Sequence, residues 1–360
     1  MFLNALIFLT AAGASHLLTN SFINFSHRFS FLDYPGLLKK HPKPTPYLGG
    51  VAVFLSFWIT VFAGIVIVYI FGNKPGALEY SSRLFAGILT MQPKLFLIFI
   101  GAVIILVIGL LDDRFHWSPL VKLIGQIIAS FVLMSAGFKI DLFSFLGVWQ
   151  DGLTLVWILL IINAFNFIDS LDGHCVGIAF ISSSFFFVFA SNTNQPLVGL
   201  LILAFCGVML GFLAYNFSPA KVFLGDNGSL LVGYFMATFS LICKYQRTST
   251  NSISLLIPLL IFGIPLYDTF SVILVRLYRR IPPWKGDRNH FAHRLVKVGL
   301  SEKAAVILSY FISFITGGIA LLISQVDSLA AFLIVLIFLS IVFLIAFFEF
   351  YIAKHFRYVE

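Results

Sequence analysis

Four polar clusters interrupt a largely apolar chain, and each contains residue types that bind cations or phosphate groups. Leu111–Arg114 holds adjacent aspartates, Asn163–Gly173 holds two asparagines and two aspartates, Phe223–Ser229 holds a Gly-Asp-Asn-Gly-Ser string, and Asp287–Arg294 holds two histidines and two arginines. Carboxylate and amide oxygens suit Mg²⁺, whereas arginine and histidine suit phosphate and pyrophosphate. Together the clusters indicate metal-assisted chemistry on a phosphorylated substrate.

Long apolar segments must position these clusters. The 360-residue chain is 60% hydrophobic and 11% charged, and runs long enough to cross a bilayer recur along it. We expect an all-α polytopic integral membrane protein with about 11 transmembrane helices, forming a single integral membrane domain over residues 1–360. The expected spans are roughly 2–25, 47–71, 95–111, 118–137, 153–168, 174–190, 197–215, 228–243, 253–278, 304–324 and 328–352.

Basic residues predict how the spans are oriented. Of the 23 lysines and arginines, sixteen lie at the C-terminus or in the loops after the odd-numbered spans, six lie in the other loops, and Lys122 lies just inside the fourth span. Cytoplasmic loops carry the excess of basic residues, so we expect the N-terminus outside and the C-terminus in the cytoplasm. All four polar clusters then lie on the cytoplasmic face. This topology accounts for the net charge of +8, and no nucleic-acid partner is expected.

Asp112 and Asp113 close the third expected span. Neighbouring carboxylates repel each other unless a cation or a shared proton relieves the repulsion. A divalent metal or a cationic partner is therefore a natural companion, and a pair of exposed loop acids is the alternative. Lys122, one turn into the next span, could hold a phosphate as a point charge or only extend its ammonium towards the membrane surface.

The second cluster places an amide or a carboxylate at every third position, at Asn163, Asn166, Asp169 and Asp172. Residues three apart are neighbours on a helix, so Asn166 and Asp169 can converge on one ligand. Mg²⁺ takes one or two carboxylates plus substrate phosphates. Helix capping is the alternative, but it explains one or two such residues rather than four in ten.

The third and fourth clusters differ in charge. Glycines flank Asp226 and allow another group to approach the backbone closely. The N-terminus of the helix that follows favours an anion. The alternative for this Gly-Asp-Asn-Gly-Ser string is an ordinary turn, for which its composition is common. His290, His293 and Arg294 belong to the largest basic loop and suit phosphate recognition. A zinc site is the alternative for the two histidines, but no HExxH motif or cysteine accompanies them.

Asp268 is the one acid expected near the middle of a span. An acid within a membrane helix is a functional candidate, although Asp268 could instead form a structural ion pair with Arg276. Because secondary transporters and ion channels also use acids within the membrane, they are the rival class to an enzyme. Transporter sites lie near the midplane between repeated halves. Here the other acids lie at cytoplasmic helix ends, and no internal repeat is visible. A non-catalytic scaffold would not explain four clusters on one face.

Taken together, the motifs resemble those of the polyprenyl-phosphate N-acetylhexosamine-1-phosphate transferase superfamily, glycosyltransferase family 4. The similarity runs in order from the proline-rich loop His41–Gly50 to Leu300. The resemblance implies catalytic roles for Asp112, Asp113, Lys122, Asp169 and Asp172, substrate binding by Lys43, Asn163, Asn216, His290, His293 and Arg294, and Mg²⁺ held by Asp226 and Asn166, with Mn²⁺ as a substitute ion. The family's histidine motif usually reads HxHH, and Ala292 here replaces its middle histidine. This form is closer to the N-acetylglucosamine branch than to the muramoyl-pentapeptide branch.

The resemblance also implies a reaction. A polyprenyl phosphate would accept N-acetylhexosamine-1-phosphate, most often N-acetylglucosamine-1-phosphate, from a UDP-sugar, with release of UMP, as the first membrane step of cell-envelope glycan synthesis. The alternative within the family is transfer of phospho-MurNAc-pentapeptide in peptidoglycan synthesis. Further implications are a multi-pass protein of the inner (plasma) membrane, an active site on its cytoplasmic face, and a homodimer.

Overall fold

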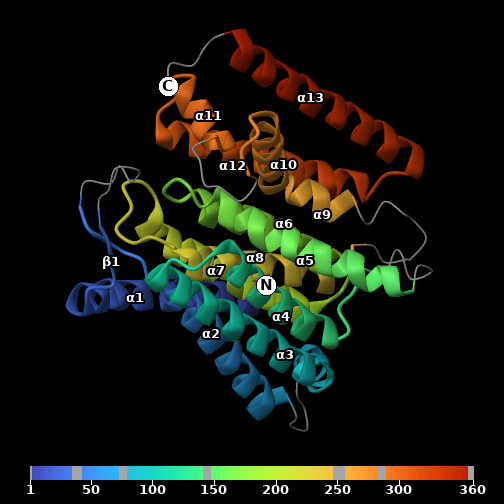
Figure 1. Ribbon diagram of the computed structural model, residues 1–360. Coiled ribbons are helices and arrows are strands. Elements are labelled where there is room, and N and C mark those ends of the chain that lie inside the picture. The colour runs from blue at the N-terminus through green and yellow to red at the C-terminus, as the bar shows by residue number, and fades with distance from the viewer. Residues whose placement is uncertain are drawn as a thin grey trace. The chain divides into compact units, whose positions relative to one another are not determined.

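The structure is a computed structural model, and it describes residues 2–34, 43–72, 79–140, 147–245, 256–282 and 289–355 (Figure 1). In these ranges the chain is helical apart from two short strands and the connecting segments. The elements are α1 (Phe2–Phe29), β1 (Leu32–Asp33), β2 (Thr45–Pro46), α2 (Gly49–Gly72), α3 (Glu79–Phe115), α4 (Pro119–Ser135), α5 (Val148–Ile168), α6 (His174–Asn192), α7 (Pro196–Asn216), α8 (Asp226–Ile242), α9 (Leu256–Ile261), α10 (Gly263–Tyr278), α11 (Phe291–Lys297), α12 (Glu302–Ile323) and α13 (Ser328–His355).

The predicted all-α membrane class is confirmed. Eight helices within the described ranges are long and apolar enough to cross a membrane. The count of about 11 spans, and the orientation of the termini, remain predictions. Each of the eleven expected segments overlaps helix within the described residues.

Four features differ from the expected elements. The ninth segment is broken at Phe262 into α9 and α10, because Pro265 has no N–H to donate to the carbonyl four residues earlier. The third helix begins sixteen residues before its expected start and contains Pro93. The histidine motif, expected as a loop, contains the short helix α11, and β1 pairs antiparallel with β2.

The chain forms two compact units, Met1–Lys244 and Tyr245–Glu360. The single domain over residues 1–360 remains a prediction. In the first unit α8 packs against α2, α3, α5 and α6, and fifteen of its 17 residues are buried (Figure 1). A helix that is apolar on every side is a core helix, so α8 is the element around which this unit is arranged.

Two glycines allow the helices around α8 to approach it closely. A Cβ on Gly109 of α3 would overlap the backbone of Asn227 at the start of α8. A Cβ on Gly233 of α8 would lie 2.7 Å from Cα of Ile162 in α5. Small residues permit such backbone contacts between membrane helices. The first contact brings the end of α3 to the first turn of α8, and the second holds α5 against the middle of α8.

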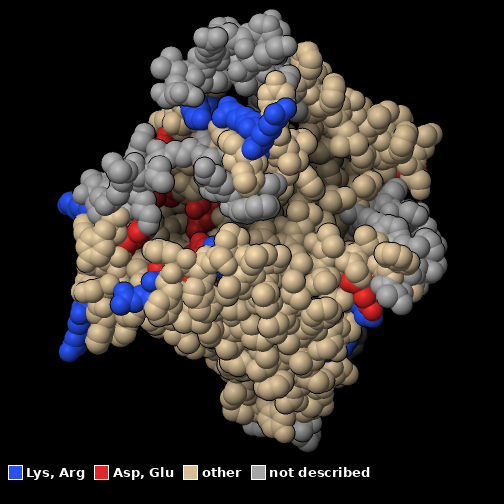
Figure 2. All heavy atoms as spheres, viewed as in Figure 1, with Lys and Arg blue, Asp and Glu red and all other residues tan. Residues whose placement is uncertain are grey.

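The second unit is arranged around α12, which packs against α9, α10, α11 and α13. Its buried positions are mostly small residues, among them Ala305, Ser309, Ser313 and Ala320. By contrast, only 6% of the apolar segment Ser328–Ile345 in α13 is buried. Large exposed apolar side chains suit a surface that faces lipid. Figure 2 agrees with this: much of the described surface on the face shown is uncharged, and several acidic side chains gather in one area.

Candidate active site

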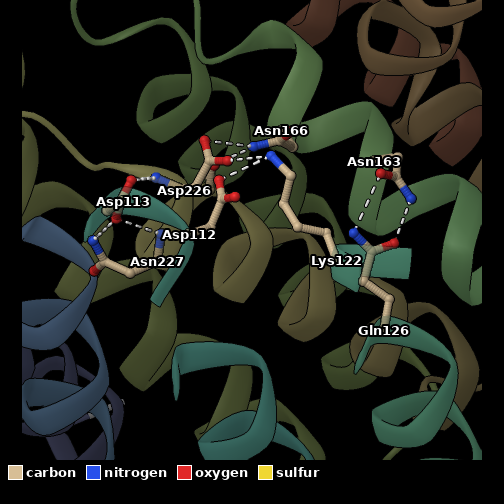
Figure 3. Close-up of polar contacts among 9 residues, drawn as sticks. Asp112, Asp113, Lys122, Gln126, Asn163, Asn166, Asp226 and Asn227 are labelled. Carbon is tan, nitrogen blue, oxygen red and sulfur yellow. Dashed lines mark hydrogen bonds and ion pairs between the residues drawn. The ribbon is translucent and has the colours of Figure 1, made fainter. Parts of the chain in front are cut away.

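Lys122 links two of the predicted acids in the first unit (Figure 3). Its Nζ lies 2.9 Å from Oδ2 of Asp112, at the end of α3, and 2.8 Å from Oδ2 of Asp226, the first residue of α8. Lys122 itself lies in the first turn of α4. The fold therefore brings Lys122 together with two of the four polar clusters, and one ammonium is shared between two carboxylates.

Asp113 holds the turn that presents Asp226. Its carboxylate accepts hydrogen bonds from the backbone N–H of Asp226 (2.9 Å), the backbone N–H of Asn227 (3.1 Å) and Nδ2 of Asn227 (2.6 Å). Gly225 has φ +72°, and a Cβ there would lie 2.9 Å from Oδ2 of Asp113. Only glycine adopts this conformation without strain. The two adjacent acids thus differ: Asp112 faces Lys122, while Asp113 fixes the Gly-Asp-Asn turn.

The asparagines of the second cluster are also separated in role. Nδ2 of Asn166 donates to Oδ1 of Asp226 (3.3 Å) and to Oγ of Ser229 (2.8 Å). Asn163, one turn earlier on α5, pairs with the side-chain amide of Gln126, with N···O distances of 2.6 and 3.3 Å (Figure 3). Asn166 therefore belongs with Asp112, Asp113, Lys122 and Asp226, which form the acid cluster, whereas Asn163 joins α4 to α5.

Two further predicted residues hold the loop between α7 and α8. Oδ1 of Asn216 accepts from the backbone N–H of Gly173 (3.2 Å), and its Nδ2 donates to the carbonyl of Val222 (2.9 Å). Oδ2 of Asp172 accepts from the backbone N–H of Ala220 (2.9 Å). Both side chains connect the turn after α5 to the segment that leads into Asp226. Their contact with a substrate stays a prediction.

Asp169 lies just beyond the end of α5 and is half-buried. Among the described residues its side chain makes no hydrogen bond. Burial, and then the negative charges of Asp226, Asp113 and Asp172, raise the pKa of its carboxyl well above the usual range.

Three polar residues that contact predicted site residues were not themselves predicted: Gln126, Asn227 and Ser229. Each has a sequence signal that could have identified it. Gln126 lies four residues after Lys122, on the same face of α4. Asn227 and Ser229 lie one and three positions after Asp226, in the first turn of α8.

The remaining predicted residues lie elsewhere in the chain. In the second unit, Nδ1 of His290 lies 2.7 Å from Oδ2 of Asp268, and Arg294 donates to Oγ of Ser271 (2.9 Å) and to the carbonyl of Asn289 (2.6 Å). The ring of His293 lies 6.5 Å from that of His290. Lys43 is exposed just before β2. Asp287, Arg288 and His41, which belonged to the sequence motifs, lie outside the described residues.

The acid cluster has the composition of a metal site that is completed by its substrate. No group of three or more His, Cys, Asp or Glu side chains within the described ranges could hold a metal ion by itself. Oδ1 of Asp112 is nevertheless buried without a hydrogen-bond partner, and the carboxylates of Asp112 and Asp226 lie on either side of one lysine. Mg²⁺ typically takes one or two carboxylates and completes its shell with phosphates and water. The residues present therefore fit such an ion.

Comparison with known proteins identifies similar chains. The sequence model of "Glycosyl transferase family 4" matches residues 95–244. A Bacillus subtilis protein named "Probable undecaprenyl-phosphate N-acetylglucosaminyl 1-phosphate transferase" is 35% identical over 322 residues, covering 86% of this chain and 83% of its own length. A Mycolicibacterium smegmatis "Decaprenyl-phosphate N-acetylglucosaminephosphotransferase" is 30% identical, with coverage of 85% and 78%. The "Undecaprenyl-phosphate alpha-N-acetylglucosaminyl 1-phosphate transferase" of Escherichia coli K12 is 28% identical, with coverage of 81% and 77%.

The matched range contains the whole acid cluster. Residues 95–244 include Asp112, Asp113, Lys122, Asn166 and Asp226. The part of the chain that matches the family is thus the part that forms the cluster.

Proposed function

The chain belongs to glycosyl transferase family 4, and from this premise we propose that it transfers N-acetylglucosamine-1-phosphate from a UDP-sugar to a polyprenyl phosphate, such as undecaprenyl phosphate. The products are polyprenyl-diphospho-N-acetylglucosamine and UMP. The observation that best supports this proposal is the position of Lys122, whose Nζ lies 2.9 Å from Oδ2 of Asp112 and 2.8 Å from Oδ2 of Asp226. The names of the relatives favour neither the muramoyl-pentapeptide reaction nor a transporter.

The reaction is a phosphoryl transfer. An oxygen of the lipid phosphate bonds to the β-phosphorus of the UDP-sugar, and the bond from that phosphorus to the bridging oxygen breaks, so UMP leaves with the electron pair. Such a reaction needs mainly positioning and charge neutralisation from the protein. The second pKa of a phosphate is near 6, so the attacking oxygen needs little help to lose its proton.

Each residue of the acid cluster has a defined part in this scheme. Asp226, with Asn166 beside it, would hold Mg²⁺, which supplies charge neutralisation at the phosphate oxygens. Asp113 is engaged by three N–H groups of the turn, so we assign the orientation of the lipid phosphate to Asp112. The ammonium of Lys122 is placed to bind a phosphate oxygen as a point charge.

Other predicted residues act on the substrates or on the loops. Asp172 and Asn216 keep the segment before Asp226 in place through Ala220 and Val222. Asp169 would position the metal, uridine or sugar. We assign the donor's phosphates and sugar to His290, His293 and Arg294, with Lys43 and Asn163 as further substrate contacts. Mn²⁺ is a substitute for Mg²⁺.

The proposal extends to location and assembly. A multi-pass protein of the plasma membrane, with its acid cluster on the cytoplasmic face, would meet UDP-sugars in the cytoplasm and the polyprenyl phosphate in the bilayer. The excess of basic residues in one set of loops supports this orientation. A homodimer is proposed from the family resemblance alone.

A UMP-release assay tests the proposal. Purified protein is given undecaprenyl phosphate and either UDP-N-acetylglucosamine or UDP-MurNAc-pentapeptide, with Mg²⁺ or with EDTA. We expect Mg²⁺-dependent UMP from the first donor only, and a loss of about 100-fold or more in Asp226→Asn, because a metal ligand is removed. Asp151→Asn is the matched control, since Asp151 forms an exposed ion pair with Lys139. UMP from the second donor alone, or full activity in Asp226→Asn, would contradict the proposal.

A further inference from the structure

Asp268 is a fully buried acid of α10, and its carboxylate contacts the histidine motif. It is 0% exposed, and its Oδ2 lies 2.7 Å from Nδ1 of His290, which is 7% exposed. Its Oδ1 accepts the backbone N–H of Phe291, the first residue of α11. Both carboxylate oxygens are thus directed at the motif, and among the described residues Asp268 pairs with His290 rather than with Arg276.

This contact determines which nitrogen of the His290 ring carries the proton. A carboxylate accepts hydrogen bonds and does not donate them, so the proton of the ring lies on Nδ1. In the neutral ring Nε2 is then the acceptor, and in the protonated ring Nε2 becomes a donor whose charge Asp268 balances. An imidazole held in this way has one orientation and one tautomer.

Other residues of α10 hold the same motif. Ser271, three positions after Asp268, accepts the hydrogen bond from Arg294. The ring of Tyr267 packs edge-on against Phe291, with centroids 5.5 Å apart, and the Arg294 guanidinium lies 5.9 Å from the Tyr267 ring centroid. Adjacent turns of α10 therefore contact both ends of the segment His290–Arg294.

We propose that Asp268 is a positioning residue for the transferase reaction: it acts through His290, by fixing the orientation and tautomer of that ring. The expected effect of Asp268 on the transfer rate rests on the proposed function, whereas the contact between Asp268 and His290 is independent of it. In metal sites, loss of the partner that orients a histidine typically costs about 10-fold to 100-fold in activity. We expect a loss of this size for Asp268→Asn, whose amide keeps the shape of the carboxylate but can offer only one acceptor oxygen to two N–H donors.

A double-mutant cycle in UMP release tests the proposal. The four proteins are the wild type, Asp268→Asn, His290→Ala and the double variant, and Asp327→Asn is the matched control because Asp327 is an exposed acid that caps α13. If Asp268 acts through His290, the change to Asn costs about 10-fold to 100-fold in the wild type and almost nothing when His290 is already alanine. An equal loss in both backgrounds, or no loss in Asp268→Asn, would overturn the proposal.

A second measurement keeps the proposal testable if Asp268→Asn fails to fold. In ¹⁵N-histidine-labelled wild-type protein, the signal of His290 is assigned by its disappearance in His290→Ala. We expect an Nδ1-protonated ring, and finding the proton on Nε2 alone would overturn the inference. If the wild type releases no UMP but this signal is present, the proposed function fails and the Asp268–His290 contact stands.

Discussion

Replacing Lys122 by methionine tests whether a cation holds the acid cluster together. Methionine keeps an apolar side chain of similar reach, so helix packing is largely preserved while the ammonium is lost. In the structure that ammonium lies 2.9 Å from Asp112 and 2.8 Å from Asp226. Without it, two carboxylates face each other and lose their shared partner.

The size of the effect follows from these distances. At an effective dielectric constant near 20, each contact represents about 6 kcal/mol of attraction before desolvation is subtracted. Breaking a buried pair by removing one partner costs about 3–5 kcal/mol. The side chains of Lys122 and Asp226 are 23% and 31% exposed, so water screens part of the interaction. We therefore expect the free energy of unfolding to fall by about 2–4 kcal/mol in the absence of metal.

Mg²⁺ should reverse much of this loss. An ion that binds the folded state at 100 times its dissociation constant stabilises it by about 2.7 kcal/mol. A divalent cation that takes the place of the ammonium should therefore stabilise Lys122→Met more than it stabilises the wild type.

The assay is thermal unfolding of purified protein in detergent, with EDTA or with increasing Mg²⁺. Lys139→Met is the control, because Lys139 also ion-pairs with an aspartate, but both side chains are 38–45% exposed and such a pair contributes about 0–1 kcal/mol. The reasoning is refuted if Lys122→Met unfolds in EDTA like the wild type. It is equally refuted if Mg²⁺ shifts both proteins by the same amount.

Three further substitutions have expected outcomes in the same unfolding assay. Gly50→Ala should destabilise by about 1–3 kcal/mol, because its Cβ would overlap the first turn of α8; Gly64→Ala in the same helix meets no atom within 4 Å and should be neutral or stabilising. Asn163→Ala should cost about 1–3 kcal/mol, because Gln126 is 2% exposed and loses its amide partner; equal stability would show that the pair contributes nothing. Asn216→Ala should cost a similar amount, about 1–3 kcal/mol, and should also lower the rate of UMP release, since the N–H of Gly173 after α5 and the carbonyl of Val222 before α8 lose their shared partner.

The helices and their class were predictable because they depend on local composition. A long run of apolar residues is helical in a membrane whatever its neighbours are, since its backbone polar groups must be satisfied within the segment. The break at Phe262 was also signalled locally, by Pro265. What the sequence could not show is that α8 is buried on nearly every side, because burial depends on which other helices surround it.

The acid cluster was predictable as a set of residues but not as an arrangement. Spacing and the positive-inside rule placed Asp112, Asp113, Lys122 and Asp226 on one face. Their division of roles could not be read from that spacing, because adjacent aspartates look alike in sequence. Only the packing of α3 on α8 places Asp113 where it accepts the N–H groups of Asp226 and Asn227, and places Asp112 in contact with Lys122.

By itself, then, the sequence determined that the protein is helical, lies in a membrane and carries cation- and phosphate-binding residues at helix ends, because hydropathy and residue chemistry are properties of short segments. The tertiary structure decided which of these residues touch. It joined Lys122 to Asp226 across 104 positions of the chain and turned Asp268, a lone acid in sequence, into the partner of His290. Such pairings depend on distances of about 3 Å between side chains of different helices, and these are fixed only when the helices pack.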